Sequence, residues 1–267
     1  MEQVFAIHCT HQKWRLFLLW SKGASMSKSS LPAFIDAVEG AEDPETLWHY
    51  VLDFFHDHEI EMVSYHHAPV RPGIDEMKVV TDGFPEEWVC HYIEQKLYTV
   101  DPIPELAARS TEPFHWKDVG KLMPLNALQI EFLKDLSEAV HGDGLGIEVF
   151  GPGLRNGYVG LGFGGDRPNL SSKDVREMQY GSQIAHLRYC TLVPTEGHPG
   201  GPLSGREREI LEWVARGKSN AVISQILELS PSTVDTYLRR IYAKLGVNDR
   251  TTAAIRGLGS GLIKGAA

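Results

Sequence analysis

The chain has 267 residues, of which 42% are hydrophobic and 23% charged, values typical of a folded protein with one large or two modest domains. No apolar run approaches the about 20 residues that a membrane span needs, and the start does not read as a signal peptide, so we expect a cytoplasmic protein with no membrane partner. The three cysteines are far apart and form no C-x-x-C motif, which argues against a disulfide framework or a cysteine zinc site.

The net charge of −9 is distributed unevenly along the chain. Residues 203–267 carry a balance of +4, whereas residues 1–202 carry −13, which suggests that the basic part meets a polyanion and the acidic part has another task. Six of the nine residues at 194–202 are Pro or Gly, as in a linker. We predict an N-terminal extension at 1–30, a first domain at 31–193, a linker at 194–202 and a second domain at 203–267.

The first domain mixes helical and strand patterns. Helical spacing of apolar residues predicts helices over residues 31–38, 46–55, 85–96, 125–141 and 171–192. Alternation and turn residues predict strands over residues 59–66, 77–81, 146–150 and 158–163, of which the last two form a hairpin. This order favours an α/β/α sandwich with an antiparallel sheet. On the last helix we expect one apolar side, made of Val175, Met178, Ile184 and Leu187.

The second domain reads as four short helices, so that the whole chain falls in the α+β class. Ser204 is an N-cap candidate whose capping box is completed by Glu207. A second helix is expected over residues 219–229, and a third begins at Ser230-Pro231 and ends at Gly246. A fourth begins at Asp249 or Thr251. The inward residues expected on the second helix are Val222, Ile223, Ile226 and Leu227.

The second and third helices are joined by a tight turn at Glu228-Leu229-Ser230, which is typical of a helix-turn-helix. The pattern alone leaves open a helical interaction domain with a solvated basic face. The segments LSGREREIL, GKSN, STV and LRRIYAKLGV resemble the helix-turn-helix of the LuxR family of bacterial transcription regulators. The signature glutamate, leucine and glycine of that family fall on Glu207, Leu211 and Gly217.

A helix-turn-helix directs the first turn of its recognition helix into the major groove. We therefore expect base or adjacent phosphate contacts from the start of the third helix and phosphate contacts from its basic residues. The first set is Ser232, Thr233, Asp235 and Thr236, and the second is Arg239, Arg240 and Lys244.

Two residues depart from the pattern of the family. Asp235 stands where many relatives carry Lys, so it must accept from a cytosine amino group, pair with a neighbouring Arg, or point aside. Glu228 occupies a turn position often held by Gly, Asn or His, where a Glu costs about 1 kcal/mol of backbone strain.

In the first domain, aromatic residues cluster around one acid. Trp88 and Tyr92 share a helix face, and Asp101 follows at a turn. Such a cluster is typical of a small-molecule site, and the alternative is a hydrophobic core beside one surface Asp. The whole set is Phe84, Trp88, Tyr92, Tyr98, Asp101, Phe114 and Trp116.

The segments FPEEW, DP and PFHW resemble the autoinducer-binding domain of quorum-sensing LuxR-type receptors. The signature positions are filled by Trp88, Tyr92, Asp101, Trp116 and Gly144. The resemblance implies an N-acyl homoserine lactone as ligand. It implies that the Trp88 indole donates to the lactone carbonyl, that Asp101 accepts from the ligand amide, and that Tyr92 and Trp116 wall the head group.

Two departures concern the ligand. Phe84 stands where many lactone receptors have a Tyr that donates to the acyl carbonyl, which removes a bond of about 1 kcal/mol. The strand at 158–163 offers no Ser or Thr where relatives often use a hydroxyl. The ligand is therefore a lactone held by fewer bonds, a different amphiphile, or absent.

Together these patterns predict a LuxR-type transcriptional regulator that responds to a small signal molecule and binds a two-fold-related operator in double-stranded DNA as a homodimer. The alternative is a LuxR-type solo regulator that needs no ligand, or senses a non-lactone ligand or a protein partner. The helix at 171–192 and the fourth helix of the second domain are the expected dimer surfaces.

We expect neither an enzyme nor a cofactor, because H-E-x-x-H, P-loop and G-x-S-x-G motifs are absent. We expect no metal site: His56, His58, His66 and His67 are interpreted as solvated residues.

Overall fold

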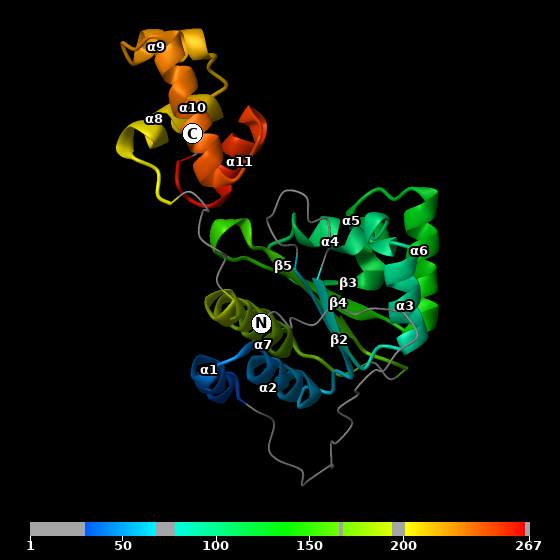
Figure 1. The fold of residues 1–267 in the computed structure, drawn as a ribbon. Helices are drawn as coiled ribbons and strands as arrows, with labels where there is room; N and C mark the ends of the chain where they lie inside the picture. Colours follow the sequence, from blue (N-terminus) through cyan, green and yellow to red (C-terminus); the bar gives the residue numbers. More distant parts are fainter. Residues whose placement is uncertain (1–29, 68–77, 166–167, 194–200, 265–267) are drawn as a thin grey trace. The chain divides into compact units, whose positions relative to one another are not determined.

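The computed structural model describes residues 30–67, 78–165, 168–193 and 201–264. These residues fall into two compact units, one built of α1–α7 and β1–β5 and the other of α8–α11 (Figure 1). The predicted extension at 1–30, apart from Ser30, and most of the predicted linker at 194–202 lie outside the described residues. Among the residues described, no helix has the length and apolar character to span a membrane.

The first unit contains seven α-helices and five strands among its described residues. Its α-helices are α1 Leu31–Gly40, α2 Pro44–His56, α3 Glu86–Glu94, α4 Pro102–Ala107, α5 Val119–Leu122, α6 Ala127–Ala139 and α7 Ser172–Leu192. Its strands are β1 Met62–His67, β2 Lys78–Asp82, β3 Phe114–His115, β4 Gly144–Val149 and β5 Gly157–Gly162. Short 3₁₀ turns occur at Leu97–Thr99 and Trp116–Asp118.

The five strands form one sheet in the order β2-β1-β5-β4-β3, and every pair is antiparallel. The predicted hairpin is the β4–β5 pair. Helices α1, α2 and α7 cover one face of the sheet, and α3 to α6 cover the other (Figure 1). The predicted α/β/α sandwich with an antiparallel sheet is thereby confirmed.

The layer of α1, α2 and α7 is packed around aromatic rings. Phe34 and Phe54 stack with their centroids 4.3 Å apart, and a Cβ added at Gly181 of α7 would lie 2.8 Å from Phe54. A glycine there lets α7 approach both rings. Met178 is fully buried but Leu187 is 46% exposed, so the prediction that both lie on one apolar side was wrong. Nine residues separate the two, which places them on opposite sides of a helix.

Two helices on the other face, α4 and α5, and the edge strand β3 were not predicted. Helix α4 begins directly after Asp101, whose carboxylate accepts from the Ile103 N–H at 2.9 Å, and Pro102 occupies its first position. Its six residues are too few for a helical period to be read from sequence. As the N-cap of α4, Asp101 is held between the helices of this face and the sheet.

The second unit contains α8 Gly205–Ala215, α9 Asn220–Ile226, α10 Pro231–Leu245 and α11 Arg250–Gly259. The predicted end signals are confirmed: Ser204 and Glu207 form a capping box, Ser230 caps α10, and Gly246 ends it with φ 63°. Helix α9 is shorter than predicted. Ile223 is buried, but Val222 and Ile226 are 38% and 41% exposed rather than inward, because this short helix packs mainly against α10.

Candidate functional site: a pocket and an exposed helix

A pocket lies between the sheet and the layer of α3, α4 and α6. Its free volume is about 50 Å³. Five of the predicted ligand residues line it together, namely Phe84, Trp88, Tyr92, Asp101 and Trp116. Four polar lining residues were not predicted, namely Ser64, His66, Thr81 and Tyr158.

Asp101 is the acidic group of the pocket. Its Oδ1 accepts from the Ile103 N–H, and its Oδ2 accepts from the Tyr92 hydroxyl at 3.0 Å. Burial raises the pKa of Asp101 to about 7, although the two hydrogen bonds act in the opposite direction. The charged form of a carboxyl that burial disfavours is stabilised by any further hydrogen-bond donor, such as an amide N–H.

The two tryptophans of the pocket differ in their partners. Trp116 Nε1 donates to the Tyr158 hydroxyl at 3.1 Å, so this indole is already satisfied. Trp88 packs beside Phe132, and its Nε1 makes no hydrogen bond to any residue in the described part of the chain. Trp88 therefore retains a donor for a ligand acceptor.

Glycines make room for the rings on the pocket face of the sheet. A Cβ at Gly144 would lie 2.5 Å from the Trp116 ring, and one at Gly146 would lie 2.6 Å from Phe114. Gly144 thus supports the pocket without lining it. At Gly160 an added Cβ would lie 2.5 Å from Ser64 Oγ.

Strand β5 has no Ser or Thr, as its sequence shows, but two other side chains bring hydroxyls to the pocket. Tyr158 supplies one from β5 itself, and Ser64 supplies another from β1, paired directly with Gly160. Residues 62–67 alternate, with Met62, Ser64 and His66 on the pocket face. That alternation was a usable signal, but β1 is far in sequence from the aromatic cluster.

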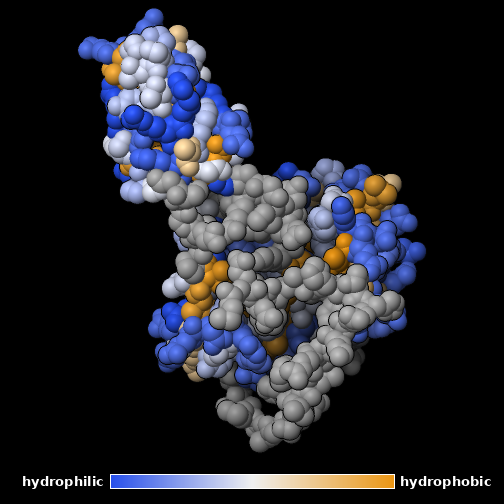
Figure 2. Space-filling view, viewed as in Figure 1, coloured by the Kyte–Doolittle hydropathy of each residue, from blue (hydrophilic) through white to orange (hydrophobic). Residues whose placement is uncertain are grey.

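In the second unit, the predicted DNA-contacting residues lie on α10. Ser232, Asp235, Thr236, Arg239 and Arg240 are exposed, and hydrophilic residues cover much of the visible face of this unit (Figure 2). Thr233 is half-buried and helps to cap the helix, because its hydroxyl lies 2.7 Å from Ser230 Oγ. The exposed face is the one that a recognition helix turns toward DNA.

Asp235 follows one of the three predicted options, since it pairs with a neighbouring arginine. Its Oδ2 lies 3.5 Å from Arg239, and its Oδ1 accepts from the Asn220 amide at 3.4 Å. Glu228 has φ 53°, so the strained turn position is also confirmed.

Lys244 does not fit its predicted role as a phosphate contact. Its ammonium donates to the buried Glu207 carboxylate at 2.7 Å and to the Pro202 carbonyl at 3.0 Å. Burial alone would raise the pKa of Glu207, but the hydrogen bonds from Lys244 and Ser204 hold it below its usual value. Lys244 therefore stabilises the start of α8 rather than offering a free charge.

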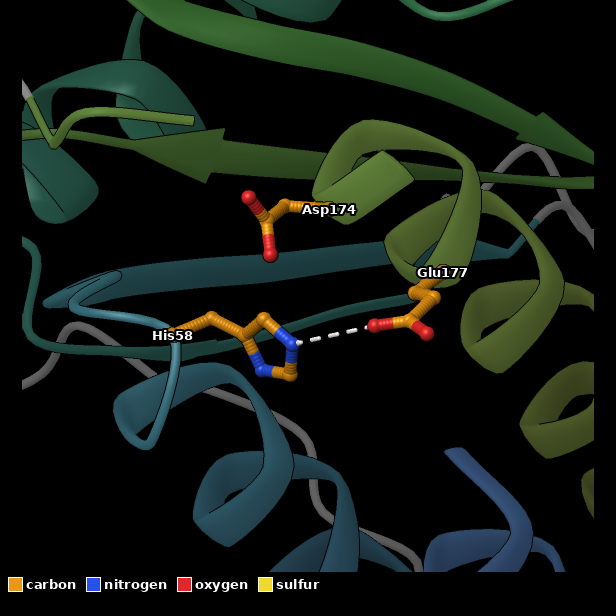
Figure 3. A group of neighbouring side chains, drawn as sticks. All are labelled: His58, Asp174 and Glu177. Carbon is orange, nitrogen blue, oxygen red and sulfur yellow. Dashed lines mark ion pairs between the residues drawn. The ribbon is translucent and has the colours of Figure 1, made fainter. Parts of the chain in front are cut away.

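One group of described residues has metal-ligand chemistry: His58, Asp174 and Glu177, whose ligand atoms lie within 4.8 Å of one another (Figure 3). His58 is 2% exposed, which corrects the expectation that it is solvated. Its Nδ1 contacts the Phe54 carbonyl at 2.7 Å, and its Nε2 lies 3.9 Å from Glu177. Asp174 accepts from Ser171, so the group joins α2 to α7 through contacts within the protein.

Two of the other three histidines also depart from the solvated interpretation, since His67 is 5% exposed and His66 lines the pocket. His56 is exposed, as predicted, and lies 3.5 Å from Asp82. The Asp82 contact raises the pKa of His56.

Comparison with known families assigns each of the two units to a family. The autoinducer binding domain family matches residues 43–189, and the luxR family of bacterial regulatory proteins matches residues 201–256. The quorum sensing-dependent transcriptional regulator RpaR of Rhodopseudomonas palustris is 30% identical over 192 residues, which cover 72% of this chain and 77% of RpaR. The quorum-sensing regulator RhlR of Pseudomonas aeruginosa is 31% identical over 186 residues, covering 67% and 74%.

Among solved structures, SdiA of Escherichia coli has the same two-domain fold, with a TM-score of 0.66 and 23% identity over 88% of this chain and 98% of SdiA. The relatives are transcriptional regulators, which confirms that the chain is not an enzyme. With its autoinducer-binding domain and its luxR-family helix-turn-helix, the chain belongs to the LuxR family of quorum-sensing transcriptional regulators.

Proposed function

We propose that the first domain binds an N-acyl homoserine lactone or a related amphiphile, and that the second domain then binds an operator as part of a homodimer. The observation that carries the ligand proposal is the convergence of Trp88, Tyr92 and Asp101 on one pocket. A buried ester and amide must each find a partner, and this pocket has an acceptor at Asp101 and a free donor at Trp88.

In this proposal the ligand amide N–H donates to the Asp101 carboxylate, and the lactone carbonyl accepts from Trp88 Nε1. Tyr92 is already bonded to Asp101 and holds the carboxylate in place. Phe84 lines the pocket but has no hydroxyl, so the acyl carbonyl receives no bond from it. The ligand is therefore held by fewer polar contacts than the family pattern provides.

The free volume bears on how the ligand enters. About 50 Å³ is well below the roughly 300–1,000 Å³ that small-molecule sites provide. Side chains must move apart to admit a lactone. Binding then orders the surrounding helices, and a ligand that binds only the ordered form stabilises it by mass action.

The DNA proposal rests on the exposed face of α10, where Arg240 and Arg239, the latter beside Asp235, are exposed and can contact phosphates. The homodimer is supported by exposed apolar residues on both expected surfaces. On α7, Tyr180 and Leu187 are 53% and 46% exposed, and on α11, Ile255 is 56% exposed. A dimer has two recognition helices, one for each half-site of the operator, whereas a single helix-turn-helix does not bind tightly alone.

A thermal-unfolding assay of the full chain with a panel of acyl lactones tests the ligand proposal. We expect one or more lactones to raise the Tm by several degrees, because micromolar binders at high excess stabilise by roughly 3 kcal/mol. The increase should be lost in Asp101→Asn and retained in Asp135→Asn, which alters an exposed acid on α6. Equal responses in all three proteins would refute the role of Asp101.

A ligand-independent regulator is the second candidate, and the small free volume is the observation that favours it. In that case the aromatic residues form a filled core, and the second domain binds DNA at the same affinity with and without lactones. Operator binding measured with no added ligand, together with mass spectrometry of small molecules extracted from the purified protein, separates the two candidates.

A further inference from the structure

One wall of the pocket is polar where a hydrocarbon tail would need only apolar contacts. On the pocket face, β1 contributes Ser64 and His66, and β2 contributes Thr81, which is paired directly with Ser64. The Tyr158 hydroxyl lies on the same face of β5, next to β1. Asp101 and Trp88 belong to the helical side of the pocket, so this polar wall is separate from the groups assigned to the lactone head.

The hydrogen bonds of this wall assign the tautomer of His66. Ser64 Oγ donates its one proton to the Gly160 carbonyl at 3.4 Å and lies 3.1 Å from His66 Nε2. We therefore assign the imidazole proton to Nε2, with the serine oxygen as its acceptor. Burial lowers the pKa of His66 to about 4, so the imidazole is neutral at physiological pH. A neutral ring with its proton on Nε2 has a bare lone pair on Nδ1.

That lone pair is unsatisfied. Nδ1 of His66 is buried and has no hydrogen-bond partner among the described residues. The nearest rings, Tyr158 and Tyr92, meet the imidazole edge-on with centroids 5.2 and 6.0 Å away. A buried acceptor without a donor is costly, and such a group in a binding pocket selects ligands that can supply the donor.

Building on the proposed function, we infer that the polar wall of Ser64 and His66 selects a signal molecule whose acyl group carries a hydroxyl. The hydroxyl donates its proton to His66 Nδ1 and can accept in turn from a neighbouring hydroxyl. An unsubstituted acyl chain leaves His66 Nδ1 without a hydrogen-bond donor. An oxo group at the same carbon brings a second acceptor against the first, so it is disfavoured further.

The test is a set of matched acyl homoserine lactones of one chain length, unsubstituted, hydroxylated or oxo-substituted at the same carbon, repeated for successive carbons. Dissociation constants are measured by calorimetry with the full chain. For one hydroxyl position we expect binding about tenfold tighter than for the unsubstituted chain. The oxo compound should bind no better than the unsubstituted chain.

His66→Phe keeps a ring in the wall and removes both nitrogens. Within this variant the ratio of the two dissociation constants should fall to about twofold or less, while the unsubstituted lactone keeps its affinity. Tyr65→Phe is the control, because Tyr65 lies on the same strand, packs on the opposite face and bonds to His186. Tyr65→Phe should keep the wild-type ratio of the two dissociation constants. Because both constants are measured on the same variant, their ratio does not depend on small losses in stability.

Ser64→Ala gives a second route if His66→Phe does not fold, since it removes the acceptor that fixes the His66 proton on Nε2. The ratio should fall there too. Equal affinity for hydroxylated and unsubstituted chains in the wild type, or an unchanged ratio in either variant, would overturn the inference while leaving the lactone site intact. Failure of every lactone to bind would overturn the proposed function, and this inference with it.

Discussion

Replacing Asp101 by Asn should change the stability of the ligand-free protein in a pH-dependent manner. The pKa of this carboxyl is 3.8 in the unfolded reference and about 7 in the fold, because burial disfavours its charged form. The folded state therefore holds a proton that the unfolded chain has lost between these pH values. The contribution of Asp101 to the stability of the wild type therefore falls as pH rises from about 4 to about 7.

The size of the effect follows from the same two pKa values. At about 1.36 kcal/mol per pH unit, the cost of the buried carboxyl is about 1.5–2 kcal/mol at pH 5 and about 4 kcal/mol at pH 8. Asn carries no charge at either pH. The stability of Asp101→Asn relative to the wild type should therefore improve by about 2–3 kcal/mol between pH 5 and pH 8.

Urea unfolding of the full chain at pH 5 and pH 8, followed by tryptophan fluorescence, measures this difference. Other titrating groups cancel because each variant is compared with the wild type at the same pH. Asp135→Asn should show no such change, since its carboxyl is exposed. An equal difference between Asp101→Asn and the wild type at both pH values would show that the carboxyl is not held protonated by the fold.

Three further predictions concern the second domain. Glu228→Gly should raise its free energy of unfolding by about 1 kcal/mol, seen as a higher Tm, because Glu228 has φ 53°; an unchanged Tm would argue against strain. Arg239→Ala combined with Arg240→Ala should weaken binding to every DNA sequence and reduce the slope of log K against log salt by about two, and unchanged retention on heparin would count against phosphate contacts. Lys244→Met should lower the free energy of unfolding by about 2 kcal/mol by leaving Glu207 unpaired, yet keep the salt slope; a reduced slope would restore the phosphate role.

The helix-turn-helix could be predicted closely because its signals are local. Ser204, Ser230 and Gly246 each mark a helix end through a bond or a dihedral within a few residues, and the structure has all three. The role of Lys244 could not be predicted from sequence, since its partner Glu207 lies 37 positions earlier and belongs to α8. Such a pairing depends on how α8 and α10 pack.

The pocket was predicted on its helical side and at the strand 158–163, whereas the contributions of β1 and β2 were missed. Trp88, Tyr92 and Asp101 lie within one short segment, so their spacing alone indicates that they converge. Ser64 and His66 reach the same space only because β1 pairs with β5, far along the chain. Register between strands distant in sequence is set by packing of the whole sheet, and no local pattern reports it.

The glycines at 144 and 146, which pack against Trp116 and Phe114, limit how the ligand preference of this protein can change. Where glycine at 144 and 146 already abuts a ring, every substitution adds atoms into occupied space. Changes in signal preference are therefore expected from the helices across the pocket or from β1 and β2, and directed evolution of this protein should concentrate its useful changes there.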